Sequence, residues 1–451
     1  MIEIENISEL LHSKAYANIK QYFVDCNPAD AGMIIQELFE DGEARESLII
    51  LFRLLPKDIA AETFAYLDSD MQQLLIESFT DRELRAVLEE TFIDDAVDMV
   101  EEMPANVVKR ILLNTDIHTR NAINQILKYP KDSAGSIMTI EYVDLNRSMT
   151  VAQAFEHIKK TGPDKETIYT CYVKDTERKL IGIVTVKDLL LADANAVIED
   201  IMETNIVYAN THEDQEVVAE MFTKYDFLAI PVVDNENRLV GIVTVDDVID
   251  VIREENTEDI EKMAAIMPSD KPYIKTGIIE TWKKRVPWQL LLMLMATFTG
   301  KIMGIYENAL MKQAVLTTFI PMLMNTGGNA GGQTSVTIIR GLSFGEIEFR
   351  DMLKVIWKEV RVAFLCGITL AVVNFGKMMI FDSVGVMVSV VVSATILTIV
   401  CFAKIVGCVL PMLAKKVGLD PAVMANPFIT TIVDAISLVV FFRFSIMFLG
   451  L

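Results

Sequence analysis

The sequence has few of the residues that build disulfide frameworks and zinc sites. It contains five cysteines and four histidines in 451 residues, and the cysteines are odd in number, widely spaced and mostly within apolar runs. These features argue against a disulfide-stapled fold and a zinc cluster, and they fit a reducing compartment. The N-terminus lacks a basic segment followed by an apolar one, so we expect no cleaved signal peptide.

Basic residues are scarce in the first part of the chain. Residues 1–270 hold 54 acidic against 24 basic side chains, a net charge of −30, whereas residues 271–451 hold 9 against 17, a net charge of +8. A strongly acidic surface argues against nucleic acid as a partner, because phosphates need a basic one. We expect cationic partners for the first part and a different solvent for the second.

Long apolar runs are confined to the second part, where each reaches the roughly 20 residues needed to cross a bilayer. We predict five α-helical spans, at 286–306, 309–339, 362–381, 384–414 and 422–449. Lys and Arg gather before the first span, between the second and third, and after the fourth. The positive-inside rule then predicts a multi-pass protein of the cell membrane, with a cytoplasmic N-terminus and an extracytoplasmic C-terminus.

The acidic part divides into two predicted domains. Residues 1–130 show only helical periodicity, and the stretch 54–67 is echoed by 102–114 with the same Pro-polar start, which favours an all-α solenoid. Residues 131–252 contain a clearer repeat, KLIGIVTVKDLLLA followed by RLVGIVTVDDVIDV. This α/β pattern resembles a tandem pair of CBS modules.

The first repeat also carries a candidate nucleotide site. Thr185, Lys187 and Asp188 fit the T-x-x-D pattern with which CBS modules hold the ribose of adenosyl nucleotides, with the lysine beside it for phosphate. ATP or another adenine nucleotide is therefore a possible ligand of the pair. CBS pairs without a ligand are common, so an empty pair remains the alternative.

The last predicted span contains one acidic side chain, Asp434. Pro427, Thr430 and Thr431 precede it by seven, four and three residues, which places all four on one helix face. We expect Pro427 to free a backbone carbonyl, and an all-oxygen face suits a hard cation such as Mg²⁺. The alternative is a structural Asp434 paired with Lys404 or Arg443.

The second predicted span contains NTGGNAGGQTS, with polar amides at membrane depth. Gly328 and Asn329 are candidates for the lining of an ion path, because exposed polar groups at that depth must line a cavity or pack on another helix. A seam of small residues that packs helices together is the alternative.

The order of these parts resembles the MgtE family of magnesium channels. The parts are the acidic solenoid, the CBS pair, an acidic connecting helix at 253–281, and a pore domain at 282–451 with the PFITTIVD motif in its fifth span. The resemblance covers essentially the whole chain. It implies a homodimer with the ion path on its two-fold axis, Asp434 from each subunit facing a hydrated Mg²⁺, and closure by Mg²⁺ bound between cytosolic domains.

Acidic residues that could bind this regulatory Mg²⁺ form a stripe on the connecting helix and lie on the segments that could face it. Without a bound cation, the carboxylates of this stripe repel one another. Cations that bridge them would replace this repulsion with attraction. The candidates are Glu62, Asp94, Asp95, Asp98, Asp214, Glu216, Asp226, Asp247, Asp250, Glu254, Glu255, Glu258, Asp259 and Asp420. A solvated surface carboxylate is the alternative for each.

The predicted function is import of Mg²⁺ through a channel that cytosolic Mg²⁺ closes, and not an enzymatic activity. No ATPase motif and no inverted repeat is visible, which counts against a pump or a coupled exchanger. Two alternatives remain: a secondary transporter that couples divalent cations to Na⁺ or H⁺, and a membrane-anchored nucleotide-sensing scaffold.

Overall fold

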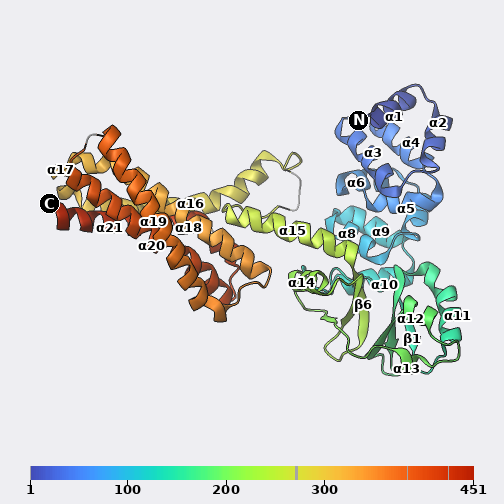
Figure 1. Cartoon of the computed structure of the whole chain (residues 1–451). Coiled ribbons are helices and arrows are strands. Elements are labelled where there is room, and N and C mark those ends of the chain that lie inside the picture. The colour runs from blue at the N-terminus through green and yellow to red at the C-terminus, as the bar shows by residue number, and fades with distance from the viewer. Residues whose placement is uncertain (1, 270–272, 383, 425, 451) are drawn as a thin grey trace. The chain divides into compact units, whose positions relative to one another are not determined.

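The computed structural model describes residues 2–269, 273–382, 384–424 and 426–450. The chain divides into two compact units, Met1–Val251 and Ile252–Leu451, and each is described by itself. In Figure 1 the first unit runs from blue to green and the second from yellow-green to red.

The first unit opens with a run of short helices, as predicted for a helical solenoid. Pro56 and Pro104 stand directly before α5 and α9, so the repeated Pro-polar motif marks equivalent helix starts. One apolar core joins this run to the domain that follows. The helices are α1 Ile2–His12, α2 Tyr16–Phe23, α3 Pro28–Glu40, α4 Arg45–Leu54, α5 Lys57–Ala65, α6 Ser69–Ser78, α7 Asp81–Leu88, α8 Ile93–Glu102, α9 Ala105–Asn114 and α10 Ile117–Ile126.

The tandem repeat forms two three-stranded sheets with the same topology. In each sheet the first pair of strands is parallel and the second is antiparallel. The strands are β1 Tyr142–Asn146, β2 Thr167–Lys174, β3 Leu180–Thr185, β4 Ala209–Asn210, β5 Ala229–Val233 and β6 Leu239–Thr244. Helices α11 Val151–Thr161, α12 Val186–Leu191, α13 Ile198–Ile201 and α14 Gln215–Tyr225 complete the pair.

The repeated glycines of the two modules explain the repeated methionines. A Cβ on Gly241 would lie 2.6 Å from the sulfur of Met138, and one on Gly182 would lie 2.5 Å from the sulfur of Met202. Each methionine therefore needs a glycine opposite it. Because Met138 packs on a strand of the second module, the segment that precedes the first module ties the two together.

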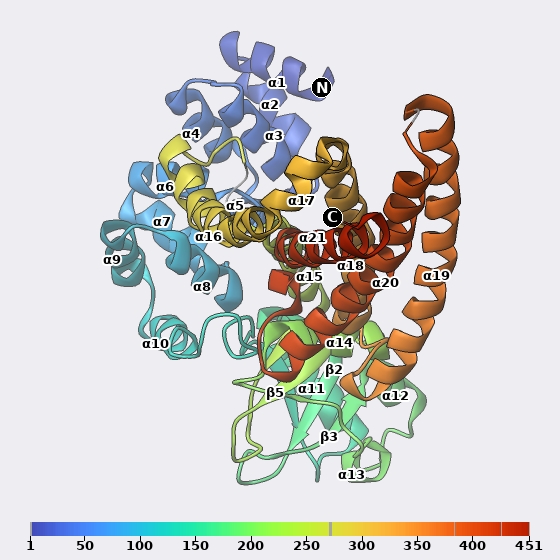
Figure 2. The same ribbon diagram turned by 90° about the vertical axis from the view of Figure 1, so that its left-hand side faces the viewer.

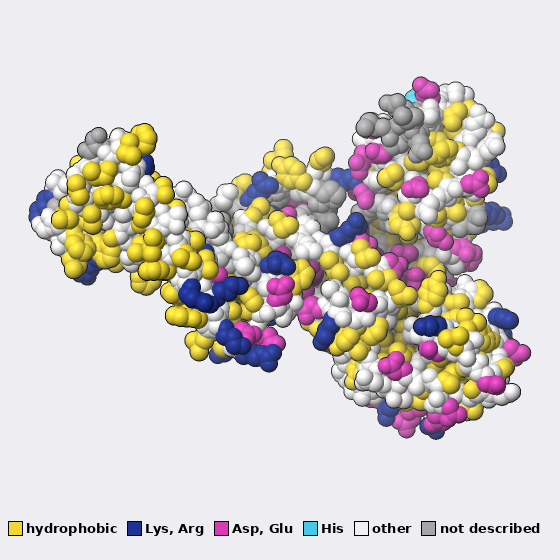
Figure 3. All heavy atoms as spheres, in the orientation of Figure 1, with side chains coloured by type: hydrophobic (Ala, Val, Ile, Leu, Met, Phe, Trp, Pro, Cys, Tyr) yellow, Lys and Arg dark blue, Asp and Glu magenta, His cyan; other side chains and the backbone are white. Residues whose placement is uncertain are grey.

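The second unit is helical, and its long helices are α16 Ile278–Ile305, α18 Ile320–Ser343, α19 Met352–Lys377, α20 Val386–Lys416 and α21 Asn426–Leu449. Among the described residues, four stretches are long and apolar enough to cross a membrane: 278–305, 349–382, 386–416 and 421–449. Hydrophobic side chains gather over this unit in Figure 3. These four correspond to the first, third, fourth and fifth predicted spans.

The second predicted span, 309–339, is not one uniform apolar helix. It is divided into α17 Glu307–Lys312, a 3₁₀ segment Ala314–Phe319 and α18, which carries amides and glycines and is not among the four apolar stretches. Its glycine face packs against α20 and α21, and Figure 2 shows these three helices side by side. A crossing at this position stays a prediction, supported by packing and not by hydropathy.

The connecting segment is shorter as a helix than predicted. Helix α15 spans Val245–Met263, starting inside the second repeat, and it ends where Ala265 adopts a positive φ of 56°. The described residues 264–269 and 273–277 are not helical, and α16 begins at Ile278. The range 253–281 is therefore not a single helix.

Small residues determine how closely the helices of the second unit approach each other. A Cβ on Gly407 of α20 would lie 2.3 Å from the carbonyl oxygen of Gly331 on α18, and one on Gly327 would lie 2.7 Å from Ile399. Only hydrogen fits in these positions. The glycines of α18 thus form a packing seam on its buried face.

Candidate functional site

Seven carboxylates from four segments of the first unit gather around one point. Asp94, Asp95 and Asp98 lie on α8, Glu141 and Glu166 directly precede β1 and β2, and Asp246 and Asp247 begin α15. We call this group the acidic cluster. It unites four predicted residues (Asp94, Asp95, Asp98 and Asp247) with three that the sequence analysis missed.

Local structure explains why Glu141 and Glu166 meet α8. The strands that they precede are parallel neighbours, and the Glu166 N–H donates to the Glu141 carbonyl at 2.9 Å. The Ile93 N–H at the start of α8 donates to Glu141 Oε2 at 2.9 Å. Parallel strand starts thus lie at one edge of the sheet, against the N-terminus of a helix, which favours negative charge.

The centre of the cluster has the geometry of a metal site. One carboxylate oxygen from each of Asp94, Glu141 and Glu166 lies within 4.8 Å of the other two. Glu166 Oε2 is shielded from solvent and has no hydrogen-bond partner among the described residues. Three hard oxygen donors are ligands of the kind that Mg²⁺ and Ca²⁺ prefer.

Desolvation and mutual repulsion raise the pKa values of the cluster. Loss of solvent, followed by the charges of Asp246 and Asp247, raises the pKa of Glu166 to about 8. Loss of solvent also raises the pKa of Asp247 to about 7, and that of Asp94 well above its usual range. The ionised cluster is therefore unstable by itself near neutral pH, and a bound divalent cation would relieve this repulsion.

Four other predicted regulatory residues lie apart from the cluster within the first unit. Glu62 is exposed on α5, Asp214 caps α14 by accepting from the Glu216 N–H at 2.9 Å, Glu216 is exposed, and Asp226 ends α14 in a left-handed conformation with φ of 55°. The capping bond and the turn are structural roles for Asp214 and Asp226. None of the four contributes to the acidic cluster.

The remaining predicted carboxylates of α15 follow the helix beyond the cluster. Asp250 and Glu254 are exposed and Glu255 is half-buried. In the second unit, Lys262 Nζ lies 2.7 Å from Asp420 Oδ2 and also pairs with Glu258. Loss of solvent and the charge of Asp420 raise the pKa of Asp259. Glu258, Asp259 and Asp420 thus lie together, around a lysine that the prediction did not include.

The proposed polar face of the last span is present on α21, but Pro427 acts differently from the prediction. Pro427 lies in the first turn of the helix, where it interrupts no helix hydrogen bond, so it frees no carbonyl of an earlier residue. Its own carbonyl accepts from the hydroxyls of Thr430 at 2.9 Å and Thr431 at 3.0 Å. Asp434 follows one turn later and is half-buried.

Asp434 has no ion pair or hydrogen bond with any other described residue. Lys404, one proposed partner, pairs instead with Glu359 of α19 at 3.5 Å and donates to Thr334 of α18 at 3.1 Å. Arg443, the other proposed partner, is exposed. The described residues therefore do not support a structural salt bridge for Asp434.

On α18, the glycines that pack against other helices and the amides that could line an ion path lie on different faces. Gly328 is buried, and a Cβ there would lie 2.9 Å from Thr430, so it belongs to the packing seam. The opposite face exposes a stripe of polar side chains, namely Asn325, Asn329, Gln333, Thr337 and Arg340. Asn329 donates to the Asn325 side chain at 3.3 Å. Packing seam and polar lining thus coexist on one helix.

The candidate nucleotide residues already serve a local purpose. Thr185 caps α12, and Asp188 accepts from both its hydroxyl and its N–H. Thr244 and Asp247 are joined in the same way, at 2.6 Å. Lys187 and Asp188 are exposed, so the first site remains open to a ligand.

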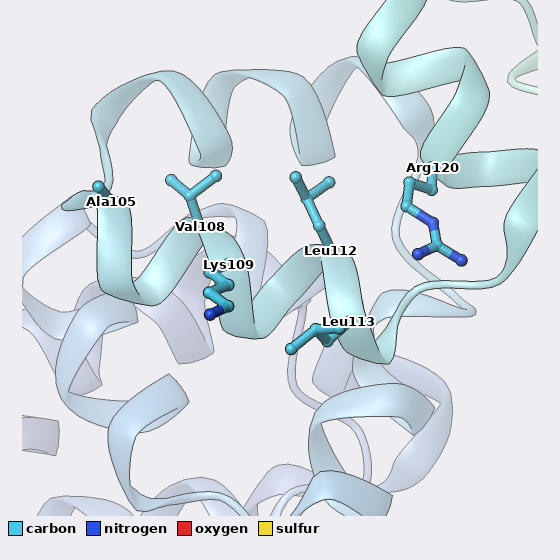
Figure 4. Close-up of a pocket in the computed structure, with 6 residues that line it drawn as sticks. All are labelled: Ala105, Val108, Lys109, Leu112, Leu113 and Arg120. Atoms are coloured by element: carbon cyan, nitrogen blue, oxygen red, sulfur yellow. The ribbon is translucent and has the colours of Figure 1, made fainter.

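A shallow groove of about 400 Å³ lies on the solenoid, on α9 and the neighbouring helix α10 (Figure 4). Figure 4 shows Val108 and Leu112 on one side of α9, Lys109 and Leu113 nearby, and Arg120 from α10. The lining contains no carboxylate. It is therefore unsuited to a cation and separate from the acidic cluster.

The fold and the family comparisons define a class: a multi-pass membrane transporter of divalent cations with an acidic first part. Residues 320–444 match the family model described as a divalent cation transporter, residues 26–132 match the MgtE intracellular N domain, and residues 134–195 and 198–254 match the CBS domain.

Curated relatives cover nearly the whole chain. The magnesium transporter MgtE of Thermus thermophilus is 35% identical over 97% of this chain and 96% of its own length, and that of Bacillus subtilis is 30% identical over 98% and 96%. The chain therefore belongs to the MgtE family of magnesium transporters. Its function is Mg²⁺ transport and not catalysis.

Solved structures agree with the fold of the first part of the chain. The cytosolic domain of the Mg²⁺ channel MgtE in complex with ATP is 34% identical, with a TM-score of 0.51, and it matches 55% of this chain and 99% of its own length. The soluble part of a magnesium transporter is 29% identical, with a TM-score of 0.51, and it matches 56% and 97%.

Proposed function

We propose that this chain is a Mg²⁺ channel that imports the ion down its electrochemical gradient. The observation that carries the proposal is the exposed polar stripe of α18 in a unit whose other long helices are apolar. Polar groups at membrane depth avoid lipid, because each unsatisfied group there costs several kcal/mol. A second copy facing the stripe would enclose a water-filled path, so we propose a homodimer.

Asp434 is the proposed ion-binding side chain of this path. Mg²⁺ sheds its waters reluctantly, so a carboxylate that holds the ion through its waters, assisted by the oxygens of Thr430 and Thr431, suits it better than a dehydrating cage. Asn329 and the neighbouring amides would bind the outer waters. In this proposal Gly328 and Pro427 act by positioning Thr430 and Thr431.

We further propose that cytosolic Mg²⁺ closes the channel by binding the acidic cluster. An ion bound by Asp94, Glu141 and Glu166 would join the solenoid to the first module, and its charge would attract Asp247 at the start of α15. Without the ion, repulsion among these carboxylates favours their separation. The fraction of clusters that hold an ion would thus report the cytosolic Mg²⁺ concentration.

ATP or another adenine nucleotide is the proposed ligand of the CBS pair. Support comes from the related cytosolic domain solved with ATP and from the exposed Lys187 beside the T-x-x-D motif. Binding of ATP to the full chain, measured by isothermal titration calorimetry, should be lost in Lys187→Met and retained in Lys224→Met. Equal binding by both variants would contradict this assignment.

Reversal potentials of the reconstituted chain in planar bilayers test the central proposal. A channel follows the Mg²⁺ gradient alone, whereas a coupled transporter also shifts its reversal potential with Na⁺ or H⁺ gradients. A nucleotide-sensing scaffold would carry no Mg²⁺ current in either condition.

Substitution of Asp434 tests the ion path. At an effective dielectric constant of about 20, a carboxylate about 8 Å from a doubly charged ion attracts it by about 4 kcal/mol, so Asp434→Asn should lower Mg²⁺ flux by up to about a thousandfold. Asp382→Asn is a matched control outside α21, because Asp382 pairs with Lys377 at 3.0 Å. A well-folded Asp434→Asn chain with parental flux would remove Asp434 from the mechanism.

A further inference from the structure

The first apolar helix is longer than a membrane crossing requires. Helix α16 has 28 residues, about 42 Å at 1.5 Å per residue, whereas a hydrocarbon core of about 30 Å takes about 20 residues. If residues 286–305 cross the core, residues 278–285 extend into the headgroup layer. This part of α16 therefore meets lipid headgroups.

The composition of that extension is typical of a membrane interface. Ile274, Ile278 and Trp282 are exposed, and three consecutive cations, Lys283, Lys284 and Arg285, follow Trp282. Exposed apolar and aromatic side chains enter the acyl boundary, and basic side chains beside them meet phosphate. The two kinds of side chain lie on one short segment.

A pocket of about 510 Å³ opens between this extension and the chain that leads into it. Its lining includes Tyr273, Thr276, Trp282, Arg285, Val286 and Gln289, and it contains no carboxylate. The Met267 N–H donates to the Lys284 carbonyl at 3.1 Å, which holds the incoming chain against the helix. The pocket is apolar toward the membrane span and cationic at Arg285.

Arg285 provides a second observation, independent of the pocket's shape. Its Nε is shielded from solvent and has no acceptor among the described residues, although its guanidinium lies 5.9 Å from the ring centre of Tyr273. It has no ion-pair partner within the described part of the chain, whereas Lys284 pairs with Glu280 at 3.8 Å. A shielded guanidinium N–H without a protein acceptor favours an anion from outside the protein.

We propose that this pocket binds the headgroup of an anionic phospholipid. The lipid phosphate accepts from Arg285, and the glycerol and acyl region lies along Trp282 and Val286 toward the span. The positive charge of Arg285 favours an anionic lipid over a neutral one. The pocket lies at the end of a membrane span, where lipid headgroups are present. The site is distinct from the proposed Mg²⁺ path and from the acidic cluster.

Native mass spectrometry of the full chain in detergent tests the proposal, with palmitoyl-oleoyl phosphatidylglycerol and phosphatidylcholine as probes. The parent should retain phosphatidylglycerol about fivefold better than phosphatidylcholine, the factor expected from one basic residue near an anionic surface. Arg285→Gln should abolish this preference, and Arg285→Lys, which keeps the charge, should retain part of it.

Lys283→Gln is the matched control, because it removes the same charge from an exposed side chain that does not line the pocket. Lys283→Gln should keep the preference. Equal losses in Lys283→Gln and Arg285→Gln would show general attraction and overturn the site. Displacement of phosphatidylglycerol by millimolar inorganic phosphate would assign the pocket to a free anion and overturn the lipid assignment.

Discussion

At the scale of single residues, the most informative side chains are Glu141 and Glu166. Each lies far along the sequence from the DDAVD motif of α8, and neither repeats in the second module. The available signal was their position directly before two strands that turn out to be parallel neighbours. Spacing along the chain does not show that such strand starts converge on another domain's helix.

Glu166→Gln should weaken closure by Mg²⁺, because it removes the charge of one of the three carboxylates whose oxygens lie within 4.8 Å of each other. We expect the Mg²⁺ concentration for half-closure to rise by at least about tenfold. Current through the reconstituted chain, recorded against cytosolic-side Mg²⁺, measures this shift. Glu156→Gln, at an exposed position on α11, should leave the value unchanged.

The affinity of the acidic cluster for Mg²⁺ should increase from pH 6 to pH 8. Asp247, with a pKa of about 7, and Glu166, with a pKa of about 8, hold protons that the ion must displace. Asp94 and Asp95 from α8, Glu141 from the first module and Asp246 from α15 face the same point and add to the repulsion. Calorimetric titration of the full chain in two buffers of different ionisation enthalpy would measure the protons released.

The same raised pKa values fix the sign of the effect on stability without Mg²⁺. The folded cluster binds more protons than the unfolded chain between about pH 4 and pH 8, so the metal-free fold should lose stability as pH rises through this window. Saturating Mg²⁺ should reduce the slope. A metal-free fold that gains stability from pH 6 to pH 8 would contradict the cluster as described.

At the scale of helices, α18 combines two faces with opposite demands. Its glycine face must approach α20 and α21 closely, and its amide face must avoid lipid. The sequence offered these as alternatives because a run of Gly and Asn satisfies both patterns. Only the direction of each side chain on the helix separates them, and that direction follows from packing partners that are far away in sequence.

Gly407→Ala should destabilise the helical unit by about 1–3 kcal/mol, because the new methyl would lie 2.3 Å from the Gly331 carbonyl. Gly300→Ala on α16 is the control, since a Cβ there meets nothing within 4 Å. The control should be neutral or slightly stabilising, as alanine favours helix. Thermal unfolding in detergent compares the two, and equal effects would contradict the seam.

The Lys404–Glu359 pair should be strongly coupled. Both side chains are shielded, at 8% and 14% exposure, and Thr334 joins them to α18. Lys404→Met or Glu359→Gln alone should cost about 3–5 kcal/mol, and the double variant should cost less than the sum. The unfolding free energies of the parent, the two single variants and the double variant in mixed detergent measure this coupling. The exposed Lys354–Asp351 pair is the control, with an expected coupling of at most about 1 kcal/mol.

At the scale of the whole molecule, the sequence predicted the order of the parts well. Charge segregation, the KLIGIVTV repeat and the apolar runs each rely on many residues, so they tolerate local errors. The second span and the connecting helix were less well predicted, because both depend on where a helix stops. Ala265, with its positive φ, gives no such signal in the sequence.

The orientation of the chain in the membrane can be tested directly. A reporter fused at the C-terminus should read as extracytoplasmic, and one inserted between α18 and α19 should read as cytoplasmic, because Arg340, Arg350 and Lys354 flank that connection. The reverse pattern would place the acidic cluster outside the cell and contradict closure by cytosolic Mg²⁺. A reporter before α16 should agree with the one between α18 and α19.

Lys262 affects the Mg²⁺ concentration at which the proposed regulation would act. Its ammonium group is tethered between Glu258 and Asp420, so its local concentration stays constant whatever the cell contains. Any free divalent cation that would bridge these two carboxylates must first displace this resident competitor. In the proposed regulation Lys262 would set a threshold for these carboxylates, and replacing it with a neutral side chain would make them respond to lower Mg²⁺ concentrations.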